Sequence, residues 1–116
     1  MLTGACHCGA VRVTVPRKPR SVTDCNCSIC RRYGVLWAYY KAATVRVEGP
    51  TQAYAWGQKA LYFVRCRTCG CVMWWERAKP DLERKMGVNW RNFPLALVEA
   101  TKVRKLDGAA WGGESW

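Results

Sequence analysis

The chain has 116 residues, of which half are hydrophobic and 12% are aromatic. This length allows one compact domain, and the composition excludes global disorder. No apolar run approaches the roughly 18 residues that a membrane-spanning helix needs. Lysine and arginine number 19 against 8 aspartates and glutamates, which gives a formal net charge of +11 and favours anionic partners.

The hydrophobic pattern predicts short strands in chain order. Residues 11–15 alternate apolar and polar side chains as a half-buried strand does, and residues 16–20 then break the pattern as a basic, proline-containing loop. Residues 31–34 predict a helical turn that ends at Gly34. The remaining strands are expected over residues 36–40, 44–47, 52–56, 61–65, 72–76, 85–90 and 102–106, with one short helix over 95–100.

We expect one domain over residues 1–108, followed by a flexible, glycine-rich C-terminal tail over 109–116. No charged segment followed by an apolar one opens the chain, so we expect a cytoplasmic protein. In that reducing compartment, a dense set of cysteines is more typical of metal binding than of disulfides. The eight cysteines fall into three groups: Cys6 and Cys8; Cys25, Cys27 and Cys30; Cys66, Cys69 and Cys71.

The close spacing within each group suits a metal ion better than a disulfide. Cysteines two or three positions apart rarely bridge without strain, whereas a turn can direct their sulfurs at one point about 2.3 Å away. Gly9 and Gly70 each follow a cysteine, where a chain that bends around an ion often needs a positive φ. Zinc is the usual occupant of all-thiolate sites, and iron is its main competitor.

The spacing predicts one closed and one open metal site. A structural zinc typically takes two ligands from each of two separated turns. The pairs that fit this arrangement are Cys6 with Cys8 and Cys66 with Cys69. The middle loop supplies three ligands, Cys25, Cys27 and Cys30, which is the number that a catalytic zinc takes from its protein.

Cys71 is left over and has two interpretations. It is either a packed thiol on the strand that leaves the last turn, or the fourth ligand of the middle site, in which case both metals are structural. Ligand geometry decides between the two.

Metal loading changes the electrostatics of the chain. Seven ligating thiolates and two zinc ions lower the formal charge from +11 to about +8. Three thiolates around one dication leave a local charge of about −1, which makes that zinc a weak Lewis acid for activating water. Its softness favours a sulfur ligand in the fourth position, so the pattern indicates thiol chemistry rather than hydrolysis.

Three segments also resemble, in order and spacing, the successive signatures of a known family. They are Gly4-Ala5-Cys6-His7-Cys8-Gly9-Ala10-Val11, Cys25-Asn26-Cys27-Ser28-Ile29-Cys30-Arg31-Arg32 and Cys66-Arg67-Thr68-Cys69-Gly70. The segment Leu106-Asp107-Gly108-Ala109 resembles the usual ending of the same family. The sequence thereby resembles the glutathione-dependent formaldehyde-activating enzyme family, which also includes the centromere protein V domain.

The resemblance implies a mostly antiparallel β fold with a zinc-ribbon-like (Mss4-like) core and few short helices. It also implies two zinc ions per chain, a structural one on the four paired cysteines and a catalytic one on the three middle cysteines. The activity of the family is the condensation of glutathione with formaldehyde to S-hydroxymethylglutathione, a carbon–sulfur lyase activity. We therefore expect an enzyme that binds a thiol such as glutathione at the open zinc and adds it to formaldehyde or another small aldehyde.

Arg31 and Arg32 directly follow Cys30 and are candidates to bind the carboxylates of a glutathione-like substrate through bidentate hydrogen bonds. A solvated charged surface is the alternative. We expect the bulky aromatic residues to lie mainly in the core, with one or two of them beside the open site. These residues are Trp37, Tyr39, Trp56, Trp74, Trp75 and Trp90.

Two functions without catalysis stay open. One is a structural zinc-binding module, and the other is a basic nucleic-acid-binding module. Because the basic residues are spread along the chain, we expect no nucleic-acid partner. We also expect no membrane partner, and a monomer or a homodimer.

Overall fold

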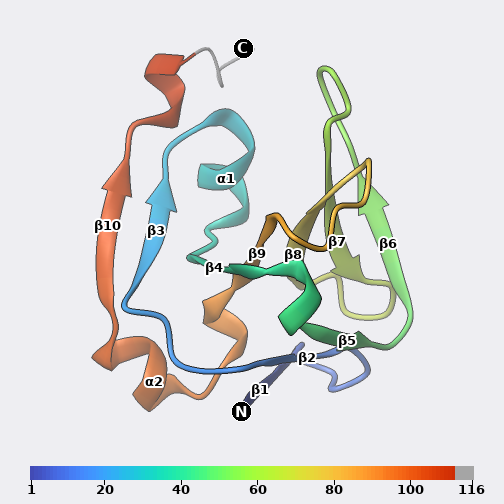
Figure 1. Cartoon of the computed structure of the whole chain (residues 1–116), viewed down its shortest axis with the longest axis vertical. Helices are drawn as coiled ribbons and strands as arrows, with labels where there is room; N and C mark the ends of the chain where they lie inside the picture. The colour runs from blue at the N-terminus through green and yellow to red at the C-terminus, as the bar shows by residue number, and fades with distance from the viewer. Residues whose placement is uncertain (112–116) are drawn as a thin grey trace.

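Two β-sheets form the framework of the protein, and the computed structural model describes them within residues 1–111 (Figure 1). The smaller sheet has three antiparallel strands in the order β1-β2-β5. These strands are β1 (Leu2–Ala5), β2 (Arg12–Val15) and β5 (Arg46–Glu48). The predicted mostly β fold class is confirmed.

The larger sheet has seven strands in the order β10-β3-β4-β9-β8-β7-β6. Its pairs are antiparallel except for β10 with β3, which run parallel at one edge, while β6 lies at the opposite edge (Figure 1). The strands are β3 (Ser21–Cys25), β4 (Trp37–Lys41), β6 (Thr51–Tyr54), β7 (Leu61–Cys66), β8 (Val72–Arg77), β9 (Lys85–Asn89) and β10 (Lys102–Leu106).

Two short α-helices, α1 (Ser28–Tyr33) and α2 (Leu95–Ala100), accompany the sheets. As predicted, α1 ends at Gly34, which has a φ of 68° and donates its N–H to the Cys30 carbonyl. Short 3-10 turns lie at Ala42–Thr44, Trp90–Asn92 and Gly108–Trp111. The last turn begins the segment predicted as a flexible tail, whose residues 112–116 lie outside the described part of the chain. Within that described part, no helix combines the length and the apolarity that crossing a membrane requires.

The strands β1 and β3 were not among the predicted elements. β3 carries the polar residues Thr23 and Asp24, and β1 contains Gly4, so neither shows a clear alternating pattern. β3 forms because the distant β10 pairs with it, whereas β1 pairs with the following strand β2 across a short turn. β10 follows β3 by about 80 positions and still aligns Leu106 with Cys25, which positions the first cysteine of the middle loop.

The buried side chains form two hydrophobic clusters. The first joins the two sheets and includes the fully buried Val13, Val15 and Val88. The second surrounds α1 and contains the middle cysteines together with aromatic side chains. Its buried members are Cys25, Ile29, Cys30, Val35, Trp37, Phe63 and Trp75.

Asn89 is a buried polar connection between strands. Its Oδ1 accepts the N–H groups of Leu36, at 3.3 Å, and Arg91, at 3.2 Å, and its Nδ2 donates to the Val72 carbonyl at 2.8 Å. One side chain therefore satisfies three main-chain groups where β9 meets the starts of β4 and β8.

We expect Asn89→Ala to lower the free energy of unfolding by about 2–3 kcal/mol, because buried main-chain groups lose their partners. Urea denaturation of the metal-loaded protein measures the change. Gln52→Ala is the matched control. The exposed Gln52 amide oxygen accepts a surface hydrogen bond from Arg65 Nη2, and its loss is expected to cost less than about 0.5 kcal/mol. Equal effects of the two substitutions would contradict the prediction.

Candidate metal centres and active site

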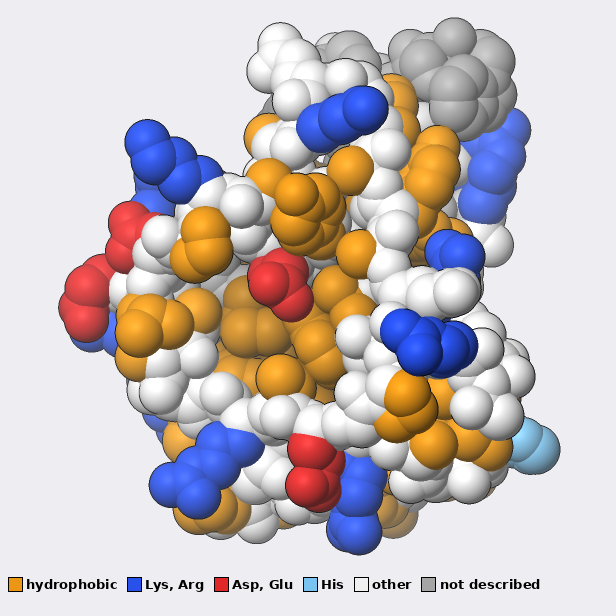
Figure 2. All heavy atoms as spheres, turned by 90° about the vertical axis from the view of Figure 1, so that its right-hand side faces the viewer, with side chains coloured by type: hydrophobic (Ala, Val, Ile, Leu, Met, Phe, Trp, Pro, Cys, Tyr) orange, Lys and Arg blue, Asp and Glu red, His pale blue; other side chains and the backbone are white. Residues whose placement is uncertain are grey.

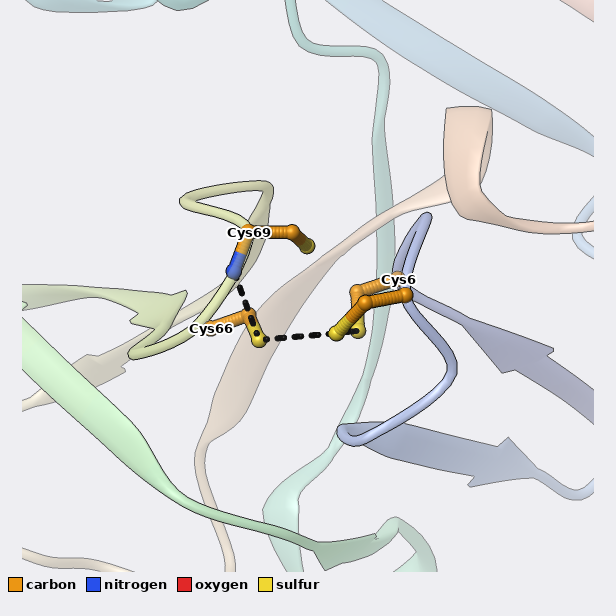
Figure 3. A group of neighbouring side chains, drawn as sticks. Cys6, Cys66 and Cys69 are labelled. Carbon is orange, nitrogen blue, oxygen red and sulfur yellow. Dashed lines mark hydrogen bonds between the residues drawn. The ribbon is translucent and has the colours of Figure 1, made fainter.

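Two turns bring four cysteines together at the junction of the two sheets. The turn between β1 and β2 carries Cys6 and Cys8, and the turn between β7 and β8 carries Cys66 and Cys69. The four sulfur atoms lie within 4.8 Å of one another, and Figure 3 shows the two turns facing each other. The structure thus assembles the four-cysteine group that the spacing predicted.

Main-chain groups hold these sulfurs in place. Cys6 Sγ accepts the Val11 N–H at 3.2 Å, and Cys66 Sγ accepts the N–H groups of Thr68 and Cys69 at 3.3 and 3.4 Å. The glycine that follows each turn has the predicted positive φ, 81° at Gly9 and 80° at Gly70. In both turns, therefore, main-chain N–H groups donate to a cysteine sulfur and fix its position.

The geometry of this group fits a tetrahedral thiolate site. Neighbouring sulfurs are 3.6 Å apart between Cys6 and Cys8 and 3.7 Å apart between Cys8 and Cys66. Four thiolates about 2.3 Å from one zinc ion lie about 3.8 Å apart. The N–H groups of Cys71 and Cys8 lower the pKa of Cys69 to about 5, which favours the thiolate that a metal requires.

The middle cysteines form a second group at the N-terminal end of α1. Cys25 ends β3, Cys27 directly precedes α1 and Cys30 lies within it, and their three sulfurs lie within 4.8 Å of one another. The Trp37 indole donates its Nε1–H to Cys30 Sγ at 3.3 Å. Burial raises the pKa of the Cys30 thiol, so a cation is needed to hold this sulfur as thiolate near neutral pH.

The C-terminal segment fixes the loop that carries these cysteines. Asn26 donates its N–H to the Leu106 carbonyl at 3.1 Å and its Nδ2 to Asp107 Oδ1 at 3.0 Å. Asn26 Oδ1 in turn accepts the Ala109 N–H at 3.0 Å. Gly108 lies so close that an added Cβ would stand 2.6 Å from Cys25 Sγ. The sequence alone indicated no role for Asn26 or Gly108, although residues 106–109 resemble the usual ending of a known family.

A cavity of about 500 Å³ opens onto the three-cysteine group. Residues of α1, of one face of the larger sheet and of the connection from β6 to β7 form its wall. Its lining residues are Cys25, Cys27, Ile29, Cys30, Trp37, Tyr39, Trp56, Gly57, Gln58, Ala60, Leu61, Phe63, Trp75 and Leu106.

The aromatic residues contribute more to this cavity than the sequence indicated. Four of the six candidates line it, namely Trp37, Tyr39, Trp56 and Trp75, where one or two were expected. Trp37 and Tyr39 alternate along β4 and so share a face of the sheet, and Tyr39 meets Trp75 edge-on with ring centroids 6.2 Å apart. The sheet order, which the sequence does not reveal, collects them on one wall.

Arg31 and Arg32 are exposed on α1, and neither is among the cavity-lining residues. Arg31 Nη1 donates to the Asn26 carbonyl at 3.2 Å, and Arg32 Nη1 donates to the Ser28 carbonyl at 2.7 Å. These bonds fasten the two guanidinium groups to the cysteine-bearing loop. Their contact with a substrate carboxylate stays a prediction.

Cys71 lies beside the four-cysteine group and not in the middle one. Its half-buried side chain packs against the first hydrophobic cluster. The main-chain N–H of His7, in the first turn, lies close enough to Cys71 to influence its pKa. This placement agrees with the packed-thiol interpretation, because the three-cysteine group gains no fourth sulfur from Cys71.

Lysine and arginine side chains stand apart from one another on the face that Figure 2 shows. They surround a hollow with hydrophobic side chains at its floor, and acidic side chains lie among them. That face offers no continuous basic surface of the kind that follows a phosphate backbone.

Comparison with known proteins identifies the family. The model of the family described as "Glutathione-dependent formaldehyde-activating enzyme" matches residues 1–94, which include both cysteine groups. The chain belongs to the glutathione-dependent formaldehyde-activating enzyme family. This confirms the family to which the sequence motifs pointed.

A solved structure of similar fold accompanies this family match. It is a crystal structure of a Rhodobacter sphaeroides protein that is 26% identical to this family member, with a TM-score of 0.72. The similarity covers 89% of this chain and 100% of that one. No curated protein matches the sequence.

We expect Cys69→Ser to lower the metal content of the purified protein by one ion per chain, because a hydroxyl is a poor ligand for a soft metal. Cys71→Ser is the matched control and is expected to keep the full metal content, since Cys71 belongs to neither group. Native mass spectrometry counts the ions. Metal loss from Cys71→Ser equal to that from Cys69→Ser would contradict this arrangement.

We expect Gly108→Ala to weaken metal retention at the three-cysteine group alone, because the added methyl displaces Cys25 Sγ. Competition with a chelator, followed by native mass spectrometry, should show one ion leaving at least about tenfold faster while the other is unaffected. Ala110→Ser, at an exposed position two residues on, provides the control. Unchanged retention in Gly108→Ala would show that the C-terminal segment does not fix the site.

Proposed function

We propose that this protein is a zinc-dependent, carbon–sulfur lyase-type enzyme that adds a thiol such as glutathione to formaldehyde or another small aldehyde. The observation that carries this proposal is the different setting of the two cysteine groups. Three cysteines form part of the wall of a large cavity, whereas none of the four paired cysteines lines it. A purely structural metal needs no such access.

The proposal assigns two zinc ions per chain. Cys6, Cys8, Cys66 and Cys69 hold a structural ion, and Cys25, Cys27 and Cys30 hold a catalytic one. Zinc bound by three thiolates supplies a soft Lewis acid, which favours sulfur as a further ligand and lowers the pKa of a thiol. Family membership supports this assignment, and so does the all-sulfur donor set, which suits zinc better than a hard cation.

The side chains of the cavity position the two reactants. The cysteine end of the cavity receives the sulfur of the thiol, and the aromatic walls exclude water from the reacting atoms. Tyr39 and Gln58 bring a hydroxyl and an amide to the wall, and both groups can hydrogen-bond to a carbonyl oxygen.

The chemical step needs no covalent protein nucleophile. The sulfur of the thiol bonds to the carbonyl carbon, and the carbonyl oxygen takes up the proton that the thiol has lost. The protein contributes proximity, orientation and activation of the attacking sulfur. The reverse step cleaves the carbon–sulfur bond, which corresponds to the lyase direction.

We expect the zinc-loaded protein to accelerate the exchange of formaldehyde with its glutathione adduct, as measured by exchange NMR. Cys27→Ser is expected to fold, to carry one zinc ion fewer and to exchange at the uncatalysed rate. Cys71→Ser is the matched control and keeps the wild-type rate. A folded Cys27→Ser protein with one zinc ion and undiminished exchange would defeat the proposal.

A further inference from the structure

Within the part of the chain that the structure describes, the cavity beside the three-cysteine group carries no lysine, arginine, aspartate or glutamate side chain on its wall. Cysteines, aromatic rings, aliphatic side chains and one glutamine make up its lining. This is unexpected in a chain with a net charge of +11. The interior of the cavity is therefore suited to uncharged groups.

Two nearby cations interact with the rings of the wall but do not line the cavity. Lys85 Nζ lies 4.5 Å from the centroid of the Tyr39 ring, and Arg77 Cζ lies 5.9 Å from that of a Trp75 ring. Both cations are thus placed against aromatic faces. Neither provides a counter-charge for a carboxylate inside the cavity.

These features restrict where a glutathione-like thiol can lie. Its carboxylates would lose their hydration inside a cavity that has no cationic side chain on its wall, and they would face the net negative charge of the metal-loaded cysteines, at a cost of several kcal/mol per group. The charged ends must therefore stay at the mouth of the cavity, with the sulfur directed at the cysteines. The rest of the cavity is left to the carbonyl partner.

A one-carbon aldehyde does not fill this space. Formaldehyde is not much larger than water, which takes up about 30 Å³ in the liquid, whereas the cavity measures about 500 Å³. The hydrophobic side chains of Leu61, Phe63 and Trp75 would gain no contact from so small a reactant. An aryl or bulky alkyl group would bury apolar surface against all three.

Resting on the proposed addition of a thiol to an aldehyde, we infer that the carbonyl substrate of this site is larger than formaldehyde: an aldehyde with an uncharged aryl or bulky alkyl substituent, which occupies the cavity. A carbon–sulfur bond forms as the carbonyl π pair moves to oxygen, which takes the proton released by the thiol. The product is a hemithioacetal, and the step needs no oxidant or reductant.

Binding of unreactive probes tests this inference apart from catalysis. With the zinc-loaded full chain, NMR titration is expected to show that 3-phenylpropan-1-ol binds at least about tenfold more tightly than 3-phenylpropanoate. The net positive charge of the chain favours the opposite order, so a preference for the neutral probe must come from the cavity. Equal or tighter binding of the carboxylate would overturn the inference.

A pair of matched variants places that binding in the cavity. Leu61→Lys introduces a charge into the wall and is expected to weaken binding of 3-phenylpropan-1-ol at least about tenfold. Leu82→Lys introduces the same charge at an exposed site outside the wall and is expected to leave the binding unchanged. Loss of binding in both variants, or in neither, would overturn the inference.

Exchange NMR with glutathione then separates the failure of the inference from the failure of the proposed function. We expect 3-phenylpropanal to have a higher kcat/KM than formaldehyde. Faster exchange of formaldehyde would overturn the inference and leave the proposed function standing. No acceleration with either aldehyde would defeat the proposed function, even if the neutral probe is preferred. If phenylmethanethiol as the thiol accelerates the exchange and 3-phenylpropanal does not, the cavity binds the substituent of the thiol, and the inference is overturned.

Discussion

The crowding of four sulfurs between two turns is the constraint on which both sheets depend. Cys8 and Cys66 are 58 positions apart in the chain, yet their sulfurs are 3.7 Å apart. Thiolates at this separation repel one another strongly unless a cation neutralises them. The close approach of the two sheets at this junction therefore depends on the binding of a metal ion. Main-chain N–H groups aimed at Cys6 and Cys66 prepare the sulfurs for that cation. The first hydrophobic cluster packs directly against this junction.

The second cysteine group depends on the same framework but is supported differently. A local loop and the start of α1 supply all three of its sulfurs, and the far end of the chain fixes their position. The parallel pairing of β10 with β3 carries the C-terminal segment to Asn26, and the close approach at Gly108 leaves Cys25 little room to move. Because the C-terminal segment, and not a fourth ligand, restrains the three cysteines, one coordination position of the site can stay free.

The distribution of charge distinguishes the site from the surface. The outer surface is basic overall, which attracts anionic reactants, while the cavity presents aromatic and aliphatic walls. Lys85 and Arg77 lie against the rings of Tyr39 and Trp75, and neither is among the residues that line the cavity. The basic surface thereby attracts anionic reactants at long range, whereas the walls of the cavity select among reactants at short range.

The sequence by itself determined the features that depend on local spacing. The grouping of seven cysteines, the turn glycines Gly9 and Gly70, the end of α1 at Gly34 and most strands follow from patterns a few residues long. Tertiary structure alone decided the strands β1 and β3, the place of Cys71, the role of Asn26 and Gly108, and the gathering of four aromatic residues on one wall. β1 pairs with the nearby β2, but β3, the role of Asn26 and Gly108, and the aromatic wall depend on pairing between segments far apart in the chain, such as β3 with β10. Short-range patterns carry no information about which distant strand becomes a neighbour.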